Sequence, residues 1–392
     1  MSDAVIVNAV RTPIGTAFRG SLTETPPEEL ARIVLAEAVQ RSQLDPAAFD
    51  DIVLAESNYG GGDLARHAAV EAGLTQVPGQ AVNRHCAGSL TAVQVAAGAI
   101  HAGMDRVIVA GGVQSSSLNP AQRRRVVGTA NDWIEDWASP AHPDTAEAPN
   151  RDMSITVGWN TAVEAGISRE DMDAWAFRSH RRAVEAIDRG AFDDEIIPVR
   201  ARQRDGSVKD FGTDEHPRRS TSMDKLASLK PIHPEIEGFS ITAGNSSGVN
   251  DAAAALTVVS SDVARAERLQ RLATVRAWAN VGGQPRLNGL AVIDCVHRVL
   301  GRARLKMSDI ALWEINEAFA SVPIAACRAL GIDEAIVNTS GSGCSLGHPV
   351  AASGARMLTT LTHELRRRGG GYALATMCAA GGQAGAIVLQ VH

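Results

Sequence analysis

The residue of this sequence best placed to act as a nucleophile is Cys86. It stands in the segment VNRHCAGSL at residues 82–90, and a run of small residues follows at 91–98. This pattern predicts a turn from a strand into a buried helix, with the cysteine at the N-terminus of the helix. The free N–H groups and the dipole at that end favour an anion, a setting that lowers the pKa of a thiol. The alternative is a packed, unreactive cysteine, because free cysteines are among the most buried residues in proteins.

A histidine in a glycine-rich loop, His348, is the candidate base. The loop reads NTSGSGCSLGHP at residues 338–349 and is followed by ASGAR at 352–356. Glycines let the backbone approach a ligand closely, and an imidazole near a cysteine is the usual activator of a thiol nucleophile. A histidine that only caps a turn is the alternative. A phosphate-binding loop is poorly supported, since GxxxxGK[ST] is absent and GxGxxG is not completed.

A second thiol, Cys378, ends an expected strand and is followed by a flexible turn. The segment reads YALATMCAAGGQ at residues 372–383, and backbone N–H groups of such a turn can stabilise a developing oxyanion. The alternative is a buried cysteine before a hairpin.

Asn316, in WEINEAFA at residues 313–320, stands where a strand is expected to give way to a helix. It is predicted either to cap that helix or to hold a water or carbonyl oxygen in an active site.

The composition is that of a globular protein with ample material for a core. Of 392 residues, 45% are hydrophobic, 21% are charged and only 4% are aromatic. The net charge of −6 argues against a nucleic-acid-binding protein. No apolar run reaches membrane-spanning length, so no membrane segment is expected.

The cysteines and the first residues indicate a reducing compartment. The five cysteines are odd in number, far apart and without a C-x-x-C pair, which leaves zinc binding and a disulfide framework poorly supported. Cys295 and Cys327 are expected in helix cores, whereas Cys344, near His348 in the sequence, is a candidate for lining the pocket of that histidine. The first residues, MSDAVIV, enter an apolar strand without a charged leader. We therefore expect a cytoplasmic protein without a metal site.

The first and last parts of the chain alternate strands with helices, which is typical of a layered α/β fold. In the first part, strands are expected at 4–8, 51–55 and 106–111, and helices at 28–41 and 89–102. From about residue 241, the expected strands are 253–259, 273–277, 310–314, 372–377 and 386–390, and the expected helices 289–300, 318–330 and 353–369. The two parts therefore look like two copies of one plan.

The zone between these parts, residues 118–240, has a different texture. It holds four of the six tryptophans and half of the prolines, and it shows few strand signals. It is interpreted as a long insertion of helices and loops, and insertions of that size in a compact protein are usually functional. Within it, a helix is expected to begin after Ser168, with Asp171 completing a capping box.

Together, these segments resemble the thiolase family, in the order in which that family has them. VNRxC at 82–86 is similar to its nucleophile motif, NEAFA at 316–320 to its asparagine motif, GHP at 347–349 to its histidine motif, and CAAGGQ at 378–383 to its second-cysteine motif. TAGNSSGVND at 242–251 looks like its CoA-contacting segment. The resemblance covers nearly the whole chain.

The resemblance implies a role for each of these residues. Cys86 would be acylated, His348 would activate it, and Cys378 would remove the α-proton in condensation or protonate the leaving enolate in cleavage. Asn316, through a water, would join His348 in an oxyanion hole for the enolate. The backbone N–H groups of Cys86 and Ala380 would form a second hole, for the tetrahedral intermediate.

The same resemblance implies the fold and the ligands. Two similar βαβαβαββ halves would form a five-layered α-β-α-β-α arrangement, with a CoA-binding loop domain inserted in the first half. The implied boundaries are 1–117 with 241–270 for the first half, 118–240 for the loop domain and 271–392 for the second half. Ser247 would contact the pantetheine of CoA, and Arg218 its nucleotide. The ligands would be acyl-CoA and CoA, with no metal or organic cofactor, and the chain would form a homodimer or homotetramer.

The implied activity is that of an acyl-CoA C-acyltransferase, which cleaves 3-oxoacyl-CoA by thiolysis or runs the reverse Claisen condensation. Some positions depart from the family's pattern: GS stands at 88–89 where Ser-Gly is common, Gln114 where glutamate is usual, and Asp152 where a histidine often precedes Met153. These changes surround the acyl pocket. They favour a substrate longer or bulkier than acetoacetyl-CoA over a dedicated acetyl-CoA acetyltransferase, which remains an alternative.

Three other activities stay open. A decarboxylating condensing enzyme of the ketoacyl-synthase kind shares the fold but needs no second cysteine, so the presence of Cys378 argues against it. A non-catalytic lipid- or CoA-binding relative would have no reason to keep both thiols, the histidine and Asn316. A Cys–His hydrolase would release a free acid rather than a new acyl-CoA.

Overall fold

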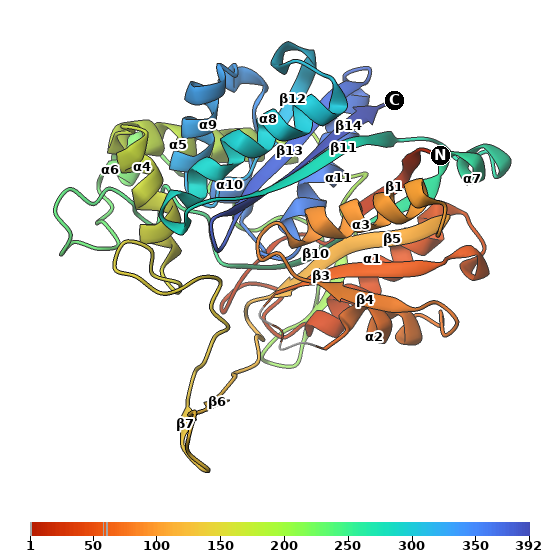
Figure 1. The fold of residues 1–392 in the computed structure, drawn as a ribbon, viewed down its shortest axis with the longest axis horizontal. Coiled ribbons are helices and arrows are strands. Elements are labelled where there is room, and N and C mark those ends of the chain that lie inside the picture. The colour runs from red at the N-terminus through yellow and green to blue at the C-terminus, as the bar shows by residue number, and fades with distance from the viewer. Residues whose placement is uncertain (1, 58, 60–61) are drawn as a thin grey trace.

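A continuous order of strands runs through the computed structural model, which describes residues 2–57, 59 and 62–392. From one edge to the other the order is β12-β13-β14-β11-β1-β10-β5-β3-β4, with β2 beside β10. The joint between β11 and β1 is short, since it pairs only Val5 with Thr274 and Ile6 with Ala273. The order therefore divides at this joint into two sheets (Figure 1).

The first half of the fold supplies one sheet and the helices around it. Its elements are β1 (Ala4–Arg11), β2 (Gly15–Thr16), α1 (Pro27–Ser42), η1 (Pro46–Ala48), β3 (Asp51–Glu56), α2 (Leu64–Glu71), β4 (Gly79–Val82), α3 (Gly88–Ala102), β5 (Val107–Ser115) and, beyond the insertion, β10 (Asn250–Ser260) and α7 (Ser261–Ala266). β3 is parallel to β4 and β5, whereas β10 is antiparallel to β1 and β5.

The second half repeats this plan. Its elements are β11 (Ala273–Gly282), η3 (Pro285–Leu290), α8 (Ala291–Ala303), η4 (Met307–Asp309), β12 (Ile310–Ile315), α9 (Ser321–Leu330), η5 (Glu334–Ile336), α10 (Gly343–Leu346), α11 (Ser353–Arg367), β13 (Gly371–Ala379) and β14 (Gln383–Val391). The order β11-β14-β13-β12 matches β1-β10-β5-β3, with the same parallel and antiparallel neighbours. The predicted duplication of one α/β plan is confirmed.

Five layers result from packing these halves together. α3 and α11 pack on each other and contact strands of both sheets, so they form the middle layer. α1 and α2 cover the outer face of the first sheet, and α8 and α9 cover that of the second. The middle core joins Leu90 of α3 and Leu358 of α11 to Ile6 and Met377 of the two sheets. The predicted α-β-α-β-α arrangement is confirmed, and its strands are apolar on both faces because both faces are covered.

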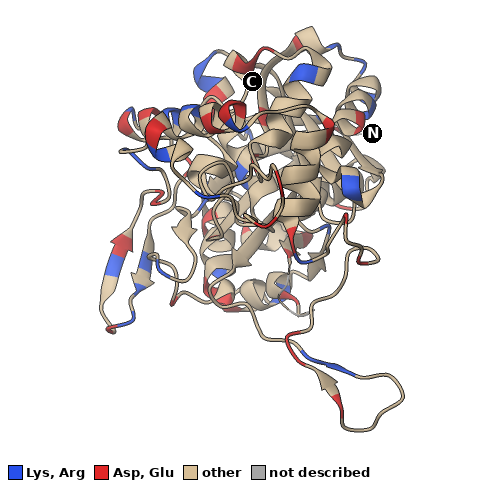
Figure 2. Ribbon diagram, turned by 90° about the vertical axis from the view of Figure 1, so that its left-hand side faces the viewer, with Lys and Arg blue, Asp and Glu red and all other residues tan. Residues whose placement is uncertain are grey.

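The insertion carries helices, loops and two short strand pairs. Its elements are β6 (Arg124–Arg125), β7 (Trp133–Ile134), a π-helix η2 (Ser154–Trp159), α4 (Asn160–Glu164), α5 (Arg169–Asp188), β8 (Val199–Arg202), β9 (Val208–Phe211) and α6 (Met223–Ala227). The β6–β7 hairpin projects far from the body of the molecule (Figures 1 and 2). The predicted capping box of α5 is confirmed, since Ser168 accepts from the N–H of Asp171 and the carboxylate of Asp171 accepts from the N–H of Ser168.

Two helices begin later than the sequence predicts. The helix expected from Gly289 begins at Ala291, after a 3₁₀ turn in which a Cβ at Gly289 would lie 2.0 Å from the hydroxyl oxygen of Thr161. The helix expected from Ala318 begins at Ser321. The residues before it bond to the segment 245–247 instead: the N–H of Ser247 donates to the carbonyl of Ala318, and that of Ala320 to the carbonyl of Asn245.

None of the helices in the described part of the chain combines the length and the apolar character that crossing a membrane requires.

Candidate active site

Cys86 lies in the tight turn between β4 and α3, as the sequence predicts. β4 ends at Val82 and α3 begins at Gly88. The preceding residue, His85, has a φ of 46°, and its N–H donates to the side-chain oxygen of Asn83 at 2.8 Å. A Cβ at Gly88 would lie 2.9 Å from the Cβ of Ala55, so the glycine lets the helix start close against β3. The turn thus presents the thiol where strands of the first sheet end.

Cys86, His348 and Cys378 line a single cavity of about 240 Å³. They come from the β4–α3 turn, from the loop before α11 and from the end of β13. The rest of the lining consists of Met153, Val157, Ser247, Gly248, Val249, Asn288, Ala318, Phe319, Val350, Ala379 and Ala380. Of the residues singled out in the sequence, the structure therefore brings together the two thiols, the imidazole, Ser247 and Ala380.

The thiol of Cys86 is not acidified by its place at the start of a helix. Burial raises its pKa to about 11, although the N–H groups of Ala380 and of Cys86 itself contact the sulfur and lower the pKa. Burial also raises the pKa of Cys378, and the neighbouring Cys86 adds to this effect. The expectation of a lowered thiol pKa is wrong, because the loss of solvation outweighs the helix end. A base must therefore take the proton when the thiol reacts.

His348 is held as a neutral imidazole in a defined tautomer. Its Nδ1 lies 2.6 Å from the hydroxyl oxygen of Ser353, whose own O–H donates to the carbonyl of Pro349 at 2.9 Å. Since a hydroxyl has one proton, the Ser353 oxygen accepts the proton of Nδ1, and Nε2 keeps a lone pair. Burial lowers the pKa of His348 to about 4, and the charge of Arg356 contributes. Nε2 is buried and has no hydrogen-bond partner among the described residues, so it is free to receive a proton.

The loop of His348 is fixed by an asparagine that the sequence reasoning missed. The backbone N–H of His348 donates to the side-chain oxygen of Asn250 at 3.0 Å, and the Asn250 amide donates to the carbonyl of Gly15 at 3.0 Å. Gly347 has a φ of 106°, and a Cβ there would lie 2.4 Å from the Asn250 amide group. The glycine before the histidine is thus required both by its backbone conformation and by this close approach. The signal was present, because Asn250 is the second-last residue of the TAGNSSGVND segment at 242–251.

Asn316 lies behind the cavity rather than in its lining. Its backbone N–H donates to the carbonyl of Thr376 at 3.1 Å, two residues before Cys378 on β13. Both polar atoms of its side chain are buried, and neither has a hydrogen-bond partner among the described residues. The helix-cap alternative is wrong, because α9 begins at Ser321. A buried amide with both atoms unpaired is suited to holding a water.

Glu317, next to Asn316, is a second residue that the sequence reasoning missed. Its carboxylate accepts from the indole N–H of Trp175 and the amide of Asn338, each at 2.8 Å, from the hydroxyl of Ser179 at 2.6 Å and from the N–H of Cys344 at 3.0 Å. This single buried carboxylate joins α5 to the loops that carry Asn316 and His348.

Cys344 is not among the described residues of the cavity lining, so the prediction that it lines the pocket is wrong.

Arg218 lies in a separate cavity of about 320 Å³, beside Arg181 and Arg219 of the insertion. Its backbone N–H donates to Nδ1 of His180 at 3.1 Å, and the His180 ring stacks on His216 with centroids 6.4 Å apart. His216 in turn packs against Gly248, which lines the cavity of the two thiols: a Cβ at Gly248 would lie 2.4 Å from the His216 ring. The two histidines therefore separate the cavity of the thiols from that of Arg218.

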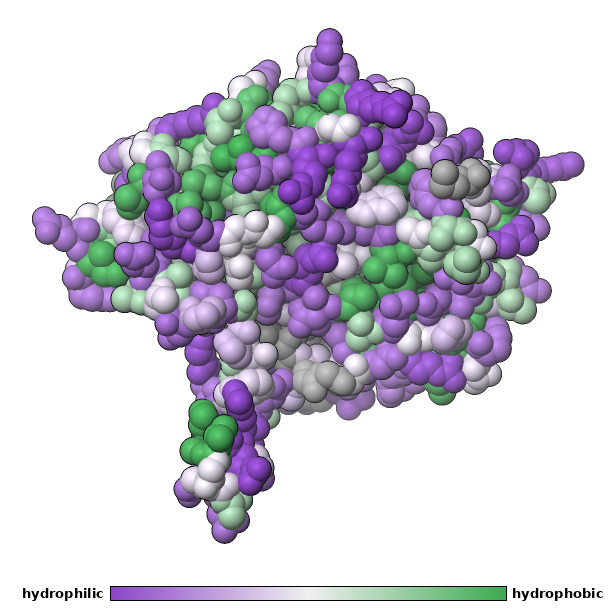
Figure 3. Space-filling view, in the orientation of Figure 1, coloured by the Kyte–Doolittle hydropathy of each residue, from purple (hydrophilic) through white to green (hydrophobic). Residues whose placement is uncertain are grey.

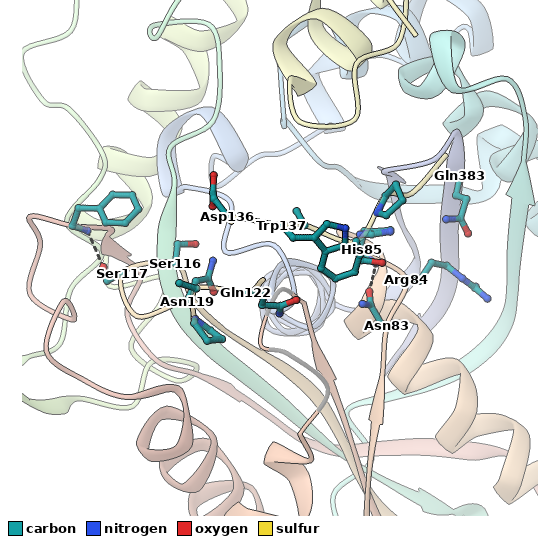
Figure 4. A pocket seen from close by; sticks show the side chains of 16 residues that line it. Asn83, Arg84, His85, Ser116, Ser117, Asn119, Gln122, Asp136, Trp137 and Gln383 are labelled. Carbon is teal, nitrogen blue, oxygen red and sulfur yellow. Dashed lines mark hydrogen bonds between the residues drawn. The ribbon is translucent and has the colours of Figure 1, made fainter. Parts of the chain in front are cut away.

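A further cavity, of about 760 Å³, is lined in part by residues of the turn that holds Cys86 (Figure 4). Its walls include Arg84 and His85 of that turn, together with Trp137 of the insertion and Gln383 of β14. Neither thiol nor His348 is among the described residues that line it. Throughout the described part of the chain, no three His, Cys, Asp or Glu side chains are grouped so that they could hold a metal ion.

Comparison with known proteins agrees with this fold over the whole chain. Residues 4–262 match the family model described as "Thiolase, N-terminal domain", and residues 269–391 match "Thiolase, C-terminal domain". The chain is 39% identical over 400 residues to the acetyl-CoA acetyltransferase of Pseudomonas aeruginosa, covering 99% of both chains. It is 38% identical over 403 residues to a beta-ketoadipyl-CoA thiolase of Acinetobacter baylyi, covering 100% of both.

Solved structures give the same result. The acetyl-CoA acetyltransferase of Bacillus anthracis superposes with a TM-score of 0.91 at 35% identity, covering 100% of this chain and 99% of that one. Human mitochondrial 3-ketoacyl-CoA thiolase in complex with CoA superposes with a TM-score of 0.90 at 30% identity, covering 100% and 98%. The fold and these similarities define an acyltransferase. The chain belongs to the thiolase family.

Proposed function

We propose that this chain cleaves 3-oxoacyl-CoA by thiolysis, and runs the reverse Claisen condensation, through an acyl group carried on Cys86. The observation that supports this most strongly is the shared cavity, in which two thiols meet an imidazole whose Nε2 carries no proton and has no hydrogen-bond partner in the described part of the chain. A thiolate is a good nucleophile and a good leaving group toward a thioester, so it suits both halves of the reaction.

In the first half-reaction, the sulfur of Cys86 attacks the C3 carbonyl carbon of the substrate while Nε2 of His348 takes the thiol proton. The N–H groups of Cys86 and Ala380, which contact the sulfur, are placed to bind the resulting oxyanion. The C2–C3 bond then breaks, which leaves an acyl group on Cys86 and the enolate of acetyl-CoA. The thiol of Cys378 protonates C2, while protonated His348 and a water on Asn316 stabilise the enolate oxygen.

In the second half-reaction, the thiol of free CoA attacks the acyl group on Cys86. The thiolate left on Cys378 takes the proton of CoA, and His348 returns a proton to Cys86 as the shortened acyl-CoA departs. The cycle restores every group to its starting state and balances without a metal, oxidant or organic cofactor. It also predicts ping-pong kinetics.

CoA is proposed to enter past Ser247, which lies half-buried in the cavity wall. Its nucleotide would then reach Arg218, whose cavity lies just beyond His216 and His180. Three arginines in or beside that cavity, Arg181, Arg218 and Arg219, can attract phosphate groups.

The acyl chain is proposed to be longer or bulkier than that of acetoacetyl-CoA. The position before Met153, where the family often has a histidine, holds Asp152, which binds Nε2 of His233 at 2.7 Å rather than facing the cavity. Relatives of similar identity include both acetyl-CoA acetyltransferases and beta-ketoadipyl-CoA thiolases. A dedicated acetyl-CoA acetyltransferase is the second candidate.

We also propose three domains: residues 1–117 together with 241–270, residues 118–240, and residues 271–392. The division is supported by β10, which pairs with β1 and β5 across the insertion.

A homodimer or homotetramer is proposed from the exposed edge strand β4 and from the projecting hairpin, which exposes Val127, Trp133 and Ile134 (Figure 3). All five cysteines are free thiols, which supports a cytoplasmic location.

The test is a thiolysis assay with 3-oxoacyl-CoA substrates of increasing chain length and free CoA. We expect acetyl-CoA and a shortened acyl-CoA as the products, with higher kcat/KM for chains beyond four carbons. Release of a free acid would indicate a hydrolase, and a requirement for a decarboxylating donor would indicate a ketoacyl-synthase type of enzyme. Cleavage of acetoacetyl-CoA alone would overturn the proposed chain length.

A further inference from the structure

One polar side chain in the wall of the reactive cavity has no role in the chemistry described above. Asn288, in the 3₁₀ turn before α8, lines the cavity together with both thiols and His348. It is only 1% exposed, and neither its amide oxygen nor its amide nitrogen has a hydrogen-bond partner among the described residues. Its backbone carbonyl is already used, since it accepts from the N–H of Ala291. The side chain is therefore free to bind a ligand.

The surroundings of Asn288 make its unpaired amide conspicuous. Most of the remaining wall is apolar, with Met153, Val157, Phe319 and Val350. Burying an amide without a partner is unfavourable, so an apolar side chain would fit this wall better if the bound acyl chain were a plain hydrocarbon. The amide offers one acceptor and two donors, which matches a group that both donates and accepts.

The lack of cationic side chains in the described cavity wall indicates that the group bound by Asn288 is neutral. No Lys or Arg is present among the described residues that line the cavity. A carboxylate on the acyl chain would thus be buried without a counter-ion, which is far more costly than burying a neutral polar group. A hydroxyl satisfies both sides of the Asn288 amide and brings no charge.

We propose that the acyl chain of the substrate carries a hydroxyl group beyond the reacting carbonyl, and that the amide of Asn288 recognises it. This inference rests on the proposed thiolase function and adds the class of substrate. It separates this chain from relatives named for 3-oxoadipyl-CoA, whose acyl chain ends in a carboxylate.

The experiment compares thiolysis of four six-carbon substrates that differ toward the end of the acyl chain. They are 3-oxohexanoyl-CoA, its 5- and 6-hydroxy derivatives, and 3-oxoadipyl-CoA. For the wild-type protein we expect a kcat/KM for the better hydroxylated substrate that is about tenfold to a hundredfold above that of 3-oxohexanoyl-CoA. The carboxylate substrate should be the poorest of the set.

Asn288→Leu, which keeps the size of the side chain, should bring the ratio of hydroxylated to plain substrate close to one. Thr161→Val is the matched control: its buried hydroxyl is also unpaired among the described residues and packs against Gly289, but Thr161 does not line the cavity. This variant should keep the wild-type ratio.

Several results would overturn the proposal. A wild-type preference for the plain or the carboxylate chain would do so even if Asn288→Leu failed to fold. An equal loss on all four substrates in Asn288→Leu would assign the amide to CoA instead. Absence of thiolysis with every substrate would refute the underlying thiolase function, which keeps the two failures distinguishable.

Discussion

At the scale of single residues, the reactive pair is a neutral thiol facing a neutral imidazole. Burial raises the pKa of Cys86 to about 11 and lowers that of His348 to about 4. The resting enzyme therefore holds no thiolate–imidazolium ion pair between Cys86 and His348. The proton moves only when the thioester arrives and the oxyanion forms against the N–H groups, which makes proton transfer part of the reaction step.

The activity should depend little on pH in the weakly acid range. Because the pKa of His348 lies near 4 in place of 6.5, the imidazole stays unprotonated, and hence competent as a base, throughout the weakly acid range. The kcat/KM for thiolysis should stay level on lowering the pH through 6.5 and should fall only toward the acid limit of stability. A pH–rate profile at fixed CoA concentration, with stability checked at each pH, measures this. An acid limb centred at 6.5 or above would contradict it.

Ser353 sets the tautomer of His348. Ser353→Ala removes the acceptor of the Nδ1 proton, so the imidazole can place its proton on Nε2 and lose its function as a base. We expect kcat to fall by about tenfold to a hundredfold, with a smaller effect on KM. Ser353→Thr keeps the hydroxyl and should restore most of the activity. If the Ala and Thr variants are equally impaired, the side chain matters only for packing.

At the scale of elements, the loop before α11 depends on a glycine conformation. Gly347→Ala combines a φ of 106° with a Cβ 2.4 Å from the Asn250 amide group. We expect a loss of about 1–3 kcal/mol in the free energy of unfolding and a larger loss of activity, since His348 is the next residue. Urea unfolding and thiolysis assays measure the two effects.

The matched control is Gly301→Ala in α8. A Cβ at Gly301 would meet no atom of the described residues within 4 Å, and the φ of Gly301 is not in the left-handed region. Because alanine is the better helix former, this variant should be more stable by about 0.5–1 kcal/mol. A stabilised Gly347→Ala, or a strongly destabilised Gly301→Ala, would show that the backbone description is wrong.

The π-helix η2 gives a pH-dependent prediction. His233 binds Glu235 at 2.8 Å and Asp152, just before η2, at 2.7 Å. The hydrogen bonds with Glu235 and then with Asp152 raise the pKa of His233 above its ordinary value of 6.5. A raised folded-state pKa contributes stability that is complete below the unfolded pKa and is lost as the pH rises through the folded one. The free energy of unfolding of the wild type should therefore exceed that of His233→Gln by up to about 1 kcal/mol at mildly acid pH. This difference should disappear at alkaline pH.

Chemical denaturation across this pH range tests the pair. A gap that stays constant, or that grows as the pH rises, would contradict the ion-pair description of Asp152 and His233.

The elements were largely predictable from the sequence, because their apolar periodicity reflects local packing on covered sheets. The motifs likewise pointed to Cys86, His348 and Cys378. The supporting contacts were not predictable: Glu317 gathers its four donors from residues 175–179 and 338–344, and Asn250 reaches from one half of the fold to the loop of the other. The prediction of a lowered pKa for Cys86 was wrong for the same reason. The helix end is visible in the sequence, but the desolvation of Cys86 comes from distant segments.

At the scale of the whole molecule, the two halves share their central layer. α3 belongs to the first half and α11 to the second, yet both contact strands of both sheets. Leu90 of α3 is fully buried in that layer. Leu90→Ala should lower the free energy of unfolding by about 2–5 kcal/mol, and unfolding should remain a single transition because neither sheet can keep its inner face covered alone.

Circular dichroism in the far and near ultraviolet, followed during denaturation at one protein concentration, tests this cooperativity. Separate transitions for the two signals would contradict the shared core.

Both thiols are proposed to act on one bound acyl group, with Cys86 carrying it and Cys378 moving the proton. The most direct measurement is mass spectrometry of the protein quenched after mixing with acetyl-CoA, combined with peptide mapping in Cys86→Ser and Cys378→Ser. We expect one acetyl group on Cys86 in the wild type and in Cys378→Ser, and none in Cys86→Ser. The Cys378→Ser variant should nevertheless fail to cleave 3-oxoacyl-CoA. An acetyl group on another residue, or normal thiolysis by Cys378→Ser, would contradict this proposal.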